Sequence, residues 1–277
     1  MSYKKVLTIQ DISCVGQCSL TVALPILSAC GLETCILPSA VLSTHTAGFT
    51  GFTVRDLAED IPAIHHHWQK EGIRFDAIYT GYLGSIGQID DVKAIMDTML
   101  TENGVRIVDP AMGDNGKLYP AFDLAYAEAM KRLCFTADII LPNITEACYL
   151  TGMEYKETYD RAYIDSLLEK LTANGAKTIV LTGVSYTAGK TGVVVLENGV
   201  YSYYEHDKFE KGSHGTGDVY ASAFVGAYLN GRTAPEAARI AADYTFKCIE
   251  ITVQDPDHWY GVKFELPLPG LISEVRK

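Results

Sequence analysis

The sequence has little positive charge. Lys and Arg total 23 against 34 Asp and Glu, which gives a formal net charge of −11 over 277 residues. Nucleic-acid binding normally needs a basic face, so we expect no nucleic-acid partner. A small polyanion could still bind through local backbone N–H groups and a bridging metal ion.

Long apolar runs are also missing. No stretch reaches the ~20 residues that a helix needs to cross a bilayer. The first residues, Met1–Lys5, run directly into an apolar strand pattern without the apolar region of a signal peptide. We therefore expect a cytoplasmic protein with no membrane partner.

Two common cofactor-site patterns are absent. The seven cysteines are scattered and form no tight C-x2-C pair of the kind found in zinc sites, so we expect reduced, buried thiols. No G-x-G-x-x-G follows the first apolar strand, where residues 11–16 read Asp-Ile-Ser-Cys-Val-Gly. This disfavours a dinucleotide-dependent oxidoreductase.

Strand-type apolar runs do alternate with amphipathic helical stretches, which indicates βαβ units. The predicted strands are Val6–Gln10, Thr34–Leu37, Ala77–Thr80, Arg106–Asp109, Asp138–Pro142, Thr178–Thr182, Val193–Leu196 and Val200–Tyr204. The predicted helices include Val54–Glu71, Asp90–Asn103 and Tyr163–Asn174. We expect one α/β domain over residues 1–277, with a mostly parallel sheet covered by helices on both faces.

Polar residues gather where these strands end. They are Gln10-Asp11, Thr80-Gly81-Tyr82, Asp109-Pro110, Asn143 and Thr182-Gly183. Ligands of parallel α/β sheets bind at the carboxyl ends of the strands, so these residues are the first candidates for a site.

A glycine-rich segment at residues 212–218, Gly-Ser-His-Gly-Thr-Gly-Asp, precedes a helical pattern. Glycine N–H groups at a helix N-terminus form an anion hole. A carboxylate beside it, at Asp218, could take the proton of a hydroxyl that attacks a phosphoryl group. The alternative is a glycine-rich loop that Asp218 merely caps.

Other segments place this motif in a family. In order along the chain they are Leu7–Gln10, Leu42–Thr46, Tyr79–Tyr82, Val108–Asp114, Ala137–Ala147, Gly215–Asp218 and Tyr260–Val262. Together they resemble the motifs of pyridoxal/pyridoxamine kinases, members of the ribokinase-like superfamily. The resemblance spans nearly the whole chain and implies a three-layer α/β/α fold.

The resemblance implies ATP-dependent phosphorylation of the 5′-hydroxymethyl group of a B6 vitamer. Asp218 would be the base, with Gly215, Thr216 and Gly217 as the anion hole. Asn143 and Glu146 would organise Mg²⁺, although Asn143-Ile144-Thr145-Glu146 also fits a helix capping box.

For the nucleotide, the resemblance implies Asp109, Asp114 and Thr182, and Lys211 lies near enough to add positive charge. Carboxylates beside phosphates require a cation between them. Asp109 could instead simply end a strand before Pro110, and Lys211 could be a solvated surface lysine.

For the vitamer, the resemblance implies contacts from His45, Thr46 and Tyr82. His45 could equally be a hydrogen-bonded structural residue. Asp11 stands where the family usually has a serine that hydrogen-bonds the pyridine nitrogen, and a carboxylate there would prefer a protonated ring nitrogen or another donor.

Because of Asp11, a hydroxymethylpyrimidine kinase of the same superfamily remains an alternative. A non-catalytic nucleotide- or metabolite-binding sensor on the same fold is another. The resemblance further suggests a homodimer and activation by K⁺.

Overall fold

Within residues 3–209 and 213–277, which the computed structural model describes, a nine-stranded sheet has the order β11-β10-β9-β8-β5-β4-β1-β2-β3. Its central strands all pair in parallel. They are β1 Lys5–Ser13, β2 Glu33–Leu42, β4 Phe75–Thr80, β5 Leu100–Val108, β8 Ile139–Ile140 and β9 Thr178–Val184.

The outer strands are antiparallel. β3 (Val54–Asp56) pairs with β2, and β10 (Lys190–Glu197) pairs with both β9 and β11 (Val200–Asp207). The β10–β11 turn is the expected one, because Asn198 (φ 52°) and Gly199 (φ 77°) both adopt the left-handed conformation that a two-residue hairpin needs. A separate small sheet joins β6 (Gly113–Asp114) to β7 (Lys117–Leu118).

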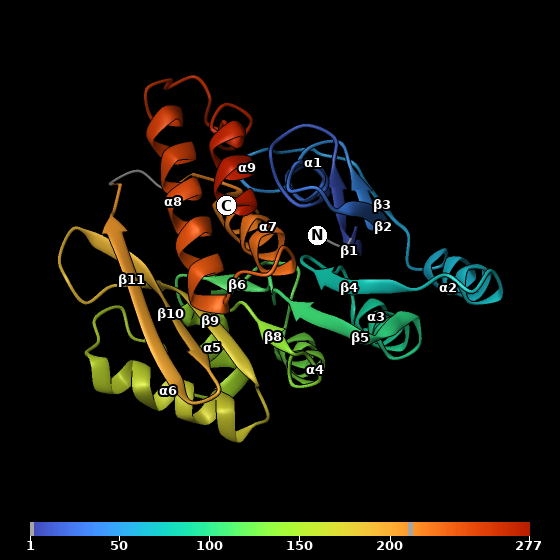
Figure 1. The fold of residues 1–277 in the computed structure, drawn as a ribbon, viewed down its shortest axis with the longest axis horizontal. Coiled ribbons are helices and arrows are strands. Elements are labelled where there is room, and N and C mark those ends of the chain that lie inside the picture. The colour runs from blue at the N-terminus through green and yellow to red at the C-terminus, as the bar shows by residue number, and fades with distance from the viewer. Residues whose placement is uncertain (1–2, 210–212) are drawn as a thin grey trace.

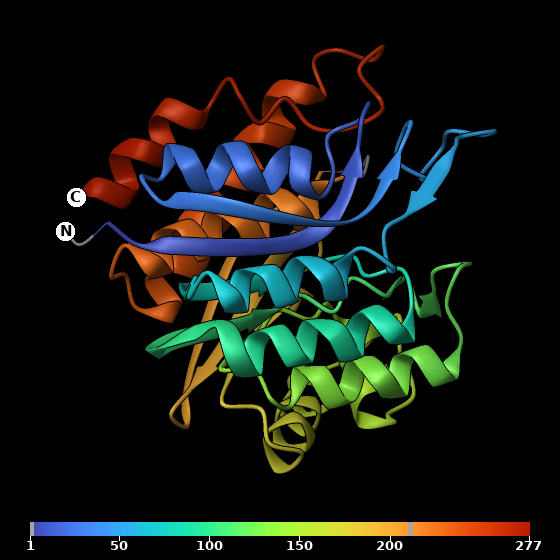
Figure 2. The same ribbon diagram turned by 90° about the vertical axis from the view of Figure 1, so that its right-hand side faces the viewer.

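Helices cover both faces of the sheet (Figures 1 and 2). One face carries α1 Leu20–Ala29, α7 Thr216–Leu229, α8 Ala234–Thr252 and α9 Leu268–Arg276. The other carries α2 Ile61–Lys70, α3 Ile86–Met99, α4 Leu124–Cys134, α5 Ile144–Thr151 and α6 Arg161–Ala173. The three-layer α/β/α architecture is therefore confirmed, whereas the division into a single domain stays a prediction.

Two predicted helices have different bounds. The helix expected over Val54–Glu71 is wrong in its first half, because Val54–Asp56 forms edge strand β3 and α2 begins only at Ile61, just before Pro62. Proline is well suited to the first turn of a helix, which favours a start there. The helix expected over Asp90–Asn103 begins earlier, at Ile86, where the Ser85 hydroxyl accepts a hydrogen bond from the Gln88 N–H.

All seven cysteines are free thiols. Four are buried, namely Cys30, Cys134, Cys148 and Cys248. Cys18 and Cys35 are partly buried, but Cys14 is exposed, so the expectation of burial is wrong for Cys14. Among the described helices, none is both long and apolar enough to cross a membrane.

Candidate active site

The polar residues at the strand ends meet at the point where the order of the strands along the sheet changes direction. The chain passes from β1 to β2 on one side and later places β4 on the other side of β1. Loops that leave the carboxyl ends of β1 and β4 therefore diverge, and the crevice between them is the usual ligand position in such sheets. Asp11 near the end of β1 and Tyr82 just after β4 flank it.

Asp11 is almost completely buried, with 4% of its surface exposed. It belongs to β1, which continues to Ser13, rather than to the loop that follows. The Ser13 hydroxyl donates a hydrogen bond to its Oδ2 at 3.0 Å. Burial raises the pKa of Asp11, while hydrogen bonds from the hydroxyls of Ser19 and Ser13 oppose the rise.

Asp218 lies in the first turn of α7, as the glycine motif predicted. Burial raises its pKa to about 6, against a hydrogen bond from the Ser19 backbone that lowers it. The negative charge of Asp11 raises the pKa of Asp218 further. Asp11, on the sheet, and Asp218, on α7, therefore lie close enough for their charges to interact.

The two glycines of this motif have different structural roles. Gly215 is the N-cap of α7 with φ 77°, and a Cβ there would lie 2.0 Å from the Gln17 carbonyl oxygen. Gly217 is helical, and a Cβ there would meet no atom of the described residues within 4 Å. Gly215 is thus required by the fold, whereas Gly217 leaves open space at the helix N-terminus beside Asp218 and Thr216.

A second group of carboxylates lies beside Asp218. Burial raises the pKa of Asp109 well above its usual value, and the charges of Glu146 and Asp218 add to the rise. Burial likewise raises the pKa of Glu146 to about 7. In the described part of the chain no Lys or Arg forms an ion pair with any of the three.

Backbone N–H groups hold these carboxylates instead. Glu146 Oε1 accepts from the Met112 N–H and Oε2 from the Asn143 N–H, both at 2.9 Å. Asp109 Oδ1 accepts from the Ala111 N–H at 3.1 Å. Neutral donors fix the geometry but leave the negative charge uncompensated, so the cluster suits a ligand that brings its own cation.

Asn143 and Glu146 form a complete capping box at the start of α5. The Asn143 Oδ1 accepts from the Glu146 N–H at 2.9 Å, and its Nδ2 donates to the Gly113 carbonyl at 2.8 Å. The capping alternative is therefore present in the structure. It does not exclude a second role toward Mg²⁺, which stays a prediction.

The three residues predicted to contact the vitamer differ in their exposure and in the neighbours that they already contact. Both ring nitrogens of His45 are used by backbone groups, since Nε2 lies 2.8 Å from the Tyr260 carbonyl and Nδ1 accepts from the Ala47 N–H at 3.2 Å. Tyr82 packs on Phe122 with ring centroids 5.3 Å apart. Thr46 is exposed. Two of these predicted residues lie near Asp11. The charge of Asp11 raises the pKa of Tyr82, and His45 lowers the pKa of Asp11.

The predicted nucleotide contacts also differ in placement. Asp114 is exposed at the β6–β7 turn, where its Oδ1 accepts from the Asn115 N–H at 2.8 Å, and its charge raises the pKa of Glu146. Thr182 lies in β9 next to Asn143, bridged to it across the sheet. Lys211 lies outside the described residues.

Three residues at the site were missed by sequence reasoning. Ser19 lies beside both Asp11 and Asp218 and lowers the pKa of each carboxyl. Thr44 has a buried hydroxyl without a partner among the described residues. Ala111 has a positive φ of 40° beside Asp109. In the sequence, only their position next to the motifs pointed to these residues. The partners of a hydroxyl and the strain in a backbone angle are decided by the tertiary fold.

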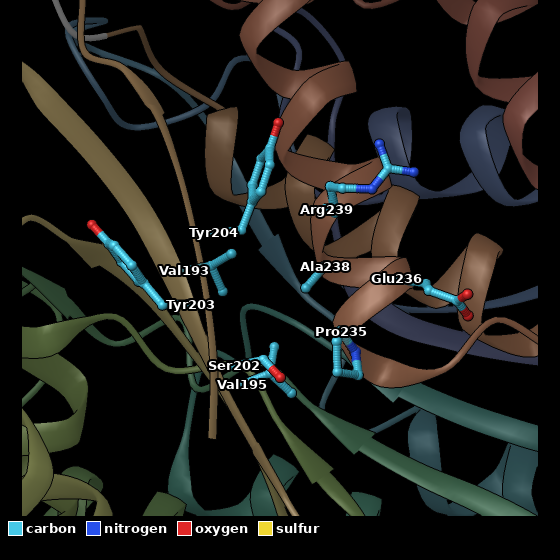
Figure 3. A pocket seen from close by; sticks show the side chains of 9 residues that line it. All are labelled: Val193, Val195, Ser202, Tyr203, Tyr204, Pro235, Glu236, Ala238 and Arg239. Atoms are coloured by element: carbon cyan, nitrogen blue, oxygen red, sulfur yellow. The ribbon is translucent and has the colours of Figure 1, made fainter. Parts of the chain in front are cut away.

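A pocket of about 270 Å³ lies elsewhere, between β10, β11 and the first turns of α8 (Figure 3). Its walls are mainly Val193, Val195, Tyr203, Tyr204 and Pro235. None of the predicted site residues in the described part of the chain lines it. The carboxylate crevice, and not this pocket, is the candidate active site.

Comparison with known proteins gives the class. The phosphomethylpyrimidine kinase family model matches residues 26–261, and the chain belongs to this family. A putative phosphomethylpyrimidine kinase from Bacteroides thetaiotaomicron, solved in a form with pyridoxal, is 34% identical with a TM-score of 0.92, covering 98% of this chain and 96% of that one.

Two further relatives are named for pyridoxal. The pyridoxal kinase structure from Lactobacillus plantarum is 32% identical with a TM-score of 0.90, covering 98% of each chain. A pyridoxal kinase from Actinobacillus succinogenes is 27% identical over 242 residues, 80% of each protein. The ribokinase-like kinase class expected from the motifs is thereby confirmed.

We predict that Gly217→Ala folds normally but loses activity. Alanine in a helix is about 1 kcal/mol more favourable than glycine, and no atom of residues 3–209 or 213–277 opposes the methyl group. If a phosphate approaches Gly217, the methyl group should lower kcat by about tenfold to a hundredfold. Thermal unfolding and steady-state kinetics measure the two effects.

Gly215→Ala and Gly231→Ala complete this test. Gly215→Ala should unfold more easily because of its clash with Gln17. Gly231 also has a positive φ, 95°, but no atom near its Cβ, so Gly231→Ala reports conformational strain alone. Unchanged kcat and KM in Gly217→Ala would exclude a phosphate contact there.

We predict that Asp109→Asn stabilises the free protein at pH 7–8. Its raised pKa means that the folded state favours the protonated form, so the ionised carboxylate costs stability above its unfolded pKa. Asn removes the charge and can still accept from Ala111. The expected result is a higher free energy of unfolding for Asp109→Asn than for the wild type at this pH.

Urea unfolding at several pH values measures this effect. The gain should shrink as the pH falls below the raised pKa of Asp109, and it should vanish near about pH 4, where the carboxyl of the unfolded chain is protonated as well. Glu169→Gln, on the exposed face of α6, is the matched loss of one charge and should change little. A destabilised Asp109→Asn protein would contradict the repulsion.

Proposed function

We propose that this protein is an ATP-dependent kinase that phosphorylates the 5′-hydroxymethyl group of a B6 vitamer. The observation that carries the proposal is the pair of Asp218 and Asp11, which face one region at the switch point between β1 and β4. A helix N-terminus beside Asp218 suits a phosphoryl group, and Asp11 suits a polar ring atom. The relative solved with pyridoxal supports the substrate class.

Asp218 would act as the general base. With a pKa of about 6 it is mostly ionised at pH 7 and is a stronger base than an ordinary aspartate. It takes the hydroxyl proton as the oxygen attacks the γ-phosphorus. The bond from the γ-phosphorus to the bridging oxygen breaks, and ADP leaves. N–H groups of the first turn of α7, at Thr216 and Gly217, would stabilise charge on the transferred group.

Asn143 and Glu146 would organise Mg²⁺ and its waters against the phosphates, and Asp109 would lie close to the metal and the nucleotide. When bound, the ion supplies the positive charge that the carboxylate cluster lacks. Asp114 and Thr182 would border the nucleotide, and Tyr82, His45 and Thr46 the vitamer. A homodimer, K⁺ activation and a cytoplasmic location stay predictions.

A hydroxymethylpyrimidine kinase is the second candidate. It is favoured by the description of the family model and by Asp11, because a carboxylate can pair with an amino or ring N–H donor of a pyrimidine. A sensor without catalysis is disfavoured by Asp218, whose raised pKa is typical of a working base rather than of a simple helix cap.

We predict ADP release from Mg-ATP with pyridoxal, pyridoxamine or pyridoxine, at kcat/KM values above that with hydroxymethylpyrimidine. Asp218→Asn should lower kcat by about a hundredfold or more, because it removes the base but keeps the shape. Coupled ADP detection measures both. Glu169→Gln should match the wild type.

The substrate panel also separates the alternatives. A higher kcat/KM on hydroxymethylpyrimidine would favour the second candidate. Ligand binding without ADP release from any of the four substrates would indicate the sensor. An Asp218→Asn enzyme with nearly normal kcat would remove the proposed mechanism.

We predict that kcat falls tenfold per pH unit below about pH 6, because protonated Asp218 cannot accept the hydroxyl proton. An ordinary aspartate would keep its activity to about pH 4. Asp11→Asn removes the like charge that raises the pKa of Asp218, so the fall in kcat should move to lower pH.

The same variant identifies the titrating group. The second ionisation of a phosphate group also lies near pH 6 but would respond little to Asp11→Asn. A pH profile of kcat that is identical in wild type and Asp11→Asn would therefore assign the fall to the phosphates and not to Asp218.

A further inference from the structure

The motif Tyr260–Val262 has no part in the candidate active site as described so far. It lies in the stretch of chain between α8 and α9, of which residues 258–265 are called the C-terminal segment. This segment returns to the loop of residues 14–19 that joins β1 to α1 (Figure 2). The residue of that loop on which the contacts converge is Gln17.

Gln17 is held by the C-terminal segment through its backbone and through both ends of its side-chain amide. Its N–H donates to the Tyr260 carbonyl at 3.4 Å. Its Nε2 donates to the two carboxylate oxygens of Glu265, at 2.9 and 3.2 Å. Its Oε1 lies 2.9 Å from Nε2 of His258, which is the donor because an amide oxygen only accepts. One segment therefore fixes both the backbone and the side chain of Gln17.

Gly261, in the middle of the motif, leaves room for this contact. A Cβ at Gly261 would lie 2.7 Å from both Cβ and Oε1 of Gln17, and 3.0 Å from its N. The φ of Gly261 lies outside the left-handed region, so the close approach and not the backbone angle calls for glycine here. The motif Tyr260–Val262 thus packs on Gln17.

The carbonyl oxygen of Gln17 contacts the start of α7. A Cβ at Gly215 would lie only 2.0 Å from this oxygen. Gly215 is the N-cap of α7, and its own carbonyl accepts from the Val219 N–H at 3.0 Å, which closes the first turn of the helix. That turn carries Asp218. The position of Gln17 therefore limits where the turn with the proposed base can lie.

We propose that Gln17 is a positioning residue for phosphoryl transfer, which connects the C-terminal segment to the first turn of α7. His258 and Glu265 fix its side chain, and its carbonyl in turn fixes Gly215. The inference rests on the proposed function, because the first turn of α7 matters to the reaction through Asp218 and the anion hole. Gln17 need not touch either substrate.

The first test reverses one hydrogen bond in the full-length protein. Gln17→Glu places two carboxylates together, so residue 17 should move away from Glu265. With pyridoxal and Mg-ATP, kcat should fall by about tenfold, because a small displacement of a reacting group is costly. Gln17→Glu/Glu265→Gln restores an amide–carboxylate pair with donor and acceptor exchanged, and kcat should return to within about threefold of wild type.

Two single changes are the controls for this exchange. Glu265→Gln alone keeps an oxygen that can accept from Gln17 Nε2, so kcat should stay within about twofold of wild type. Gln69→Glu adds the same charge at an exposed position of α2 and should leave kcat unchanged. The KM values for ATP and pyridoxal should stay within about threefold of wild type in every variant, since the anion hole acts mainly on the transition state.

Hydrogen exchange separates positioning from a merely structural role. In Gln17→Glu, the backbone amides of residues 213–222 and of the C-terminal segment should both exchange faster, and both should recover in the double variant. A residue that only anchors the C-terminal segment would change the exchange of residues 258–265 alone. Because the altered hydrogen bond lies at the surface, Tm should fall by no more than about 4 °C.

Gly261→Ala perturbs Gln17 from the other partner without changing any charge. Its methyl group would displace Gln17, so kcat should fall by about tenfold, again with faster exchange in residues 213–222. Gly270→Ala in α9 is the matched control, because its Cβ would meet no atom of the described residues within 4 Å. It should leave kcat and the exchange of residues 213–222 unchanged.

Wild-type kcat in both Gln17→Glu and Gly261→Ala would overturn the inference. So would a double variant no more active than Gln17→Glu, or unchanged exchange in residues 213–222. If the wild-type protein releases no ADP with any vitamer, the proposed function fails and the role in phosphoryl transfer fails with it. The exchange data would then still decide whether Gln17 connects the C-terminal segment to α7.

Discussion

The mutual repulsion of carboxylates at one edge of the sheet is the constraint on which the rest of the site depends. Burial raises the pKa values of Asp109, Glu146 and Asp218. The charges of Glu146 and Asp218 raise the pKa of Asp109 further, and that of Asp11 raises the pKa of Asp218. A fold can tolerate such a group only if each member is fixed by neutral donors or paired with a cation. Here the described residues supply the donors and leave the positive charge to the ligand.

Each carboxylate is held by a local feature of the backbone. The N–H groups of Met112 and Asn143 bind Glu146, that of Ala111 binds Asp109, and the backbone of Ser19 lowers the pKa of Asp218. Two of these residues, Ala111 and Ser19, have positive φ. The strained backbone angles therefore lie beside the carboxylates. Binding of a nucleotide with its cation would offset the repulsion between the carboxylates of the free protein.

Much of the architecture follows from local patterns. Strands β1, β4 and β9 were predicted because apolar runs buried on both faces carry few polar residues, and the Asn198-Gly199 turn because only left-handed residues fit it. The edge strand Val54–Asp56 was mistaken for helix because its residues are exposed and its only support is pairing with β2. Asp218 was predicted from the glycines, since a helix N-terminus is a local feature.

The sequence by itself determined the class of fold, the position of Asp218 at a helix start and the set of acidic residues near the strand ends. Only the tertiary structure decided that the charges of Asp11 and Asp218 interact and that both ring nitrogens of His45 are occupied. It also decided that the Gln17 carbonyl leaves no room for a side chain at Gly215. The reason is physical. Helix starts and strand ends depend on neighbours in the chain, whereas desolvation, charge repulsion and close packing depend on residues that only folding brings together.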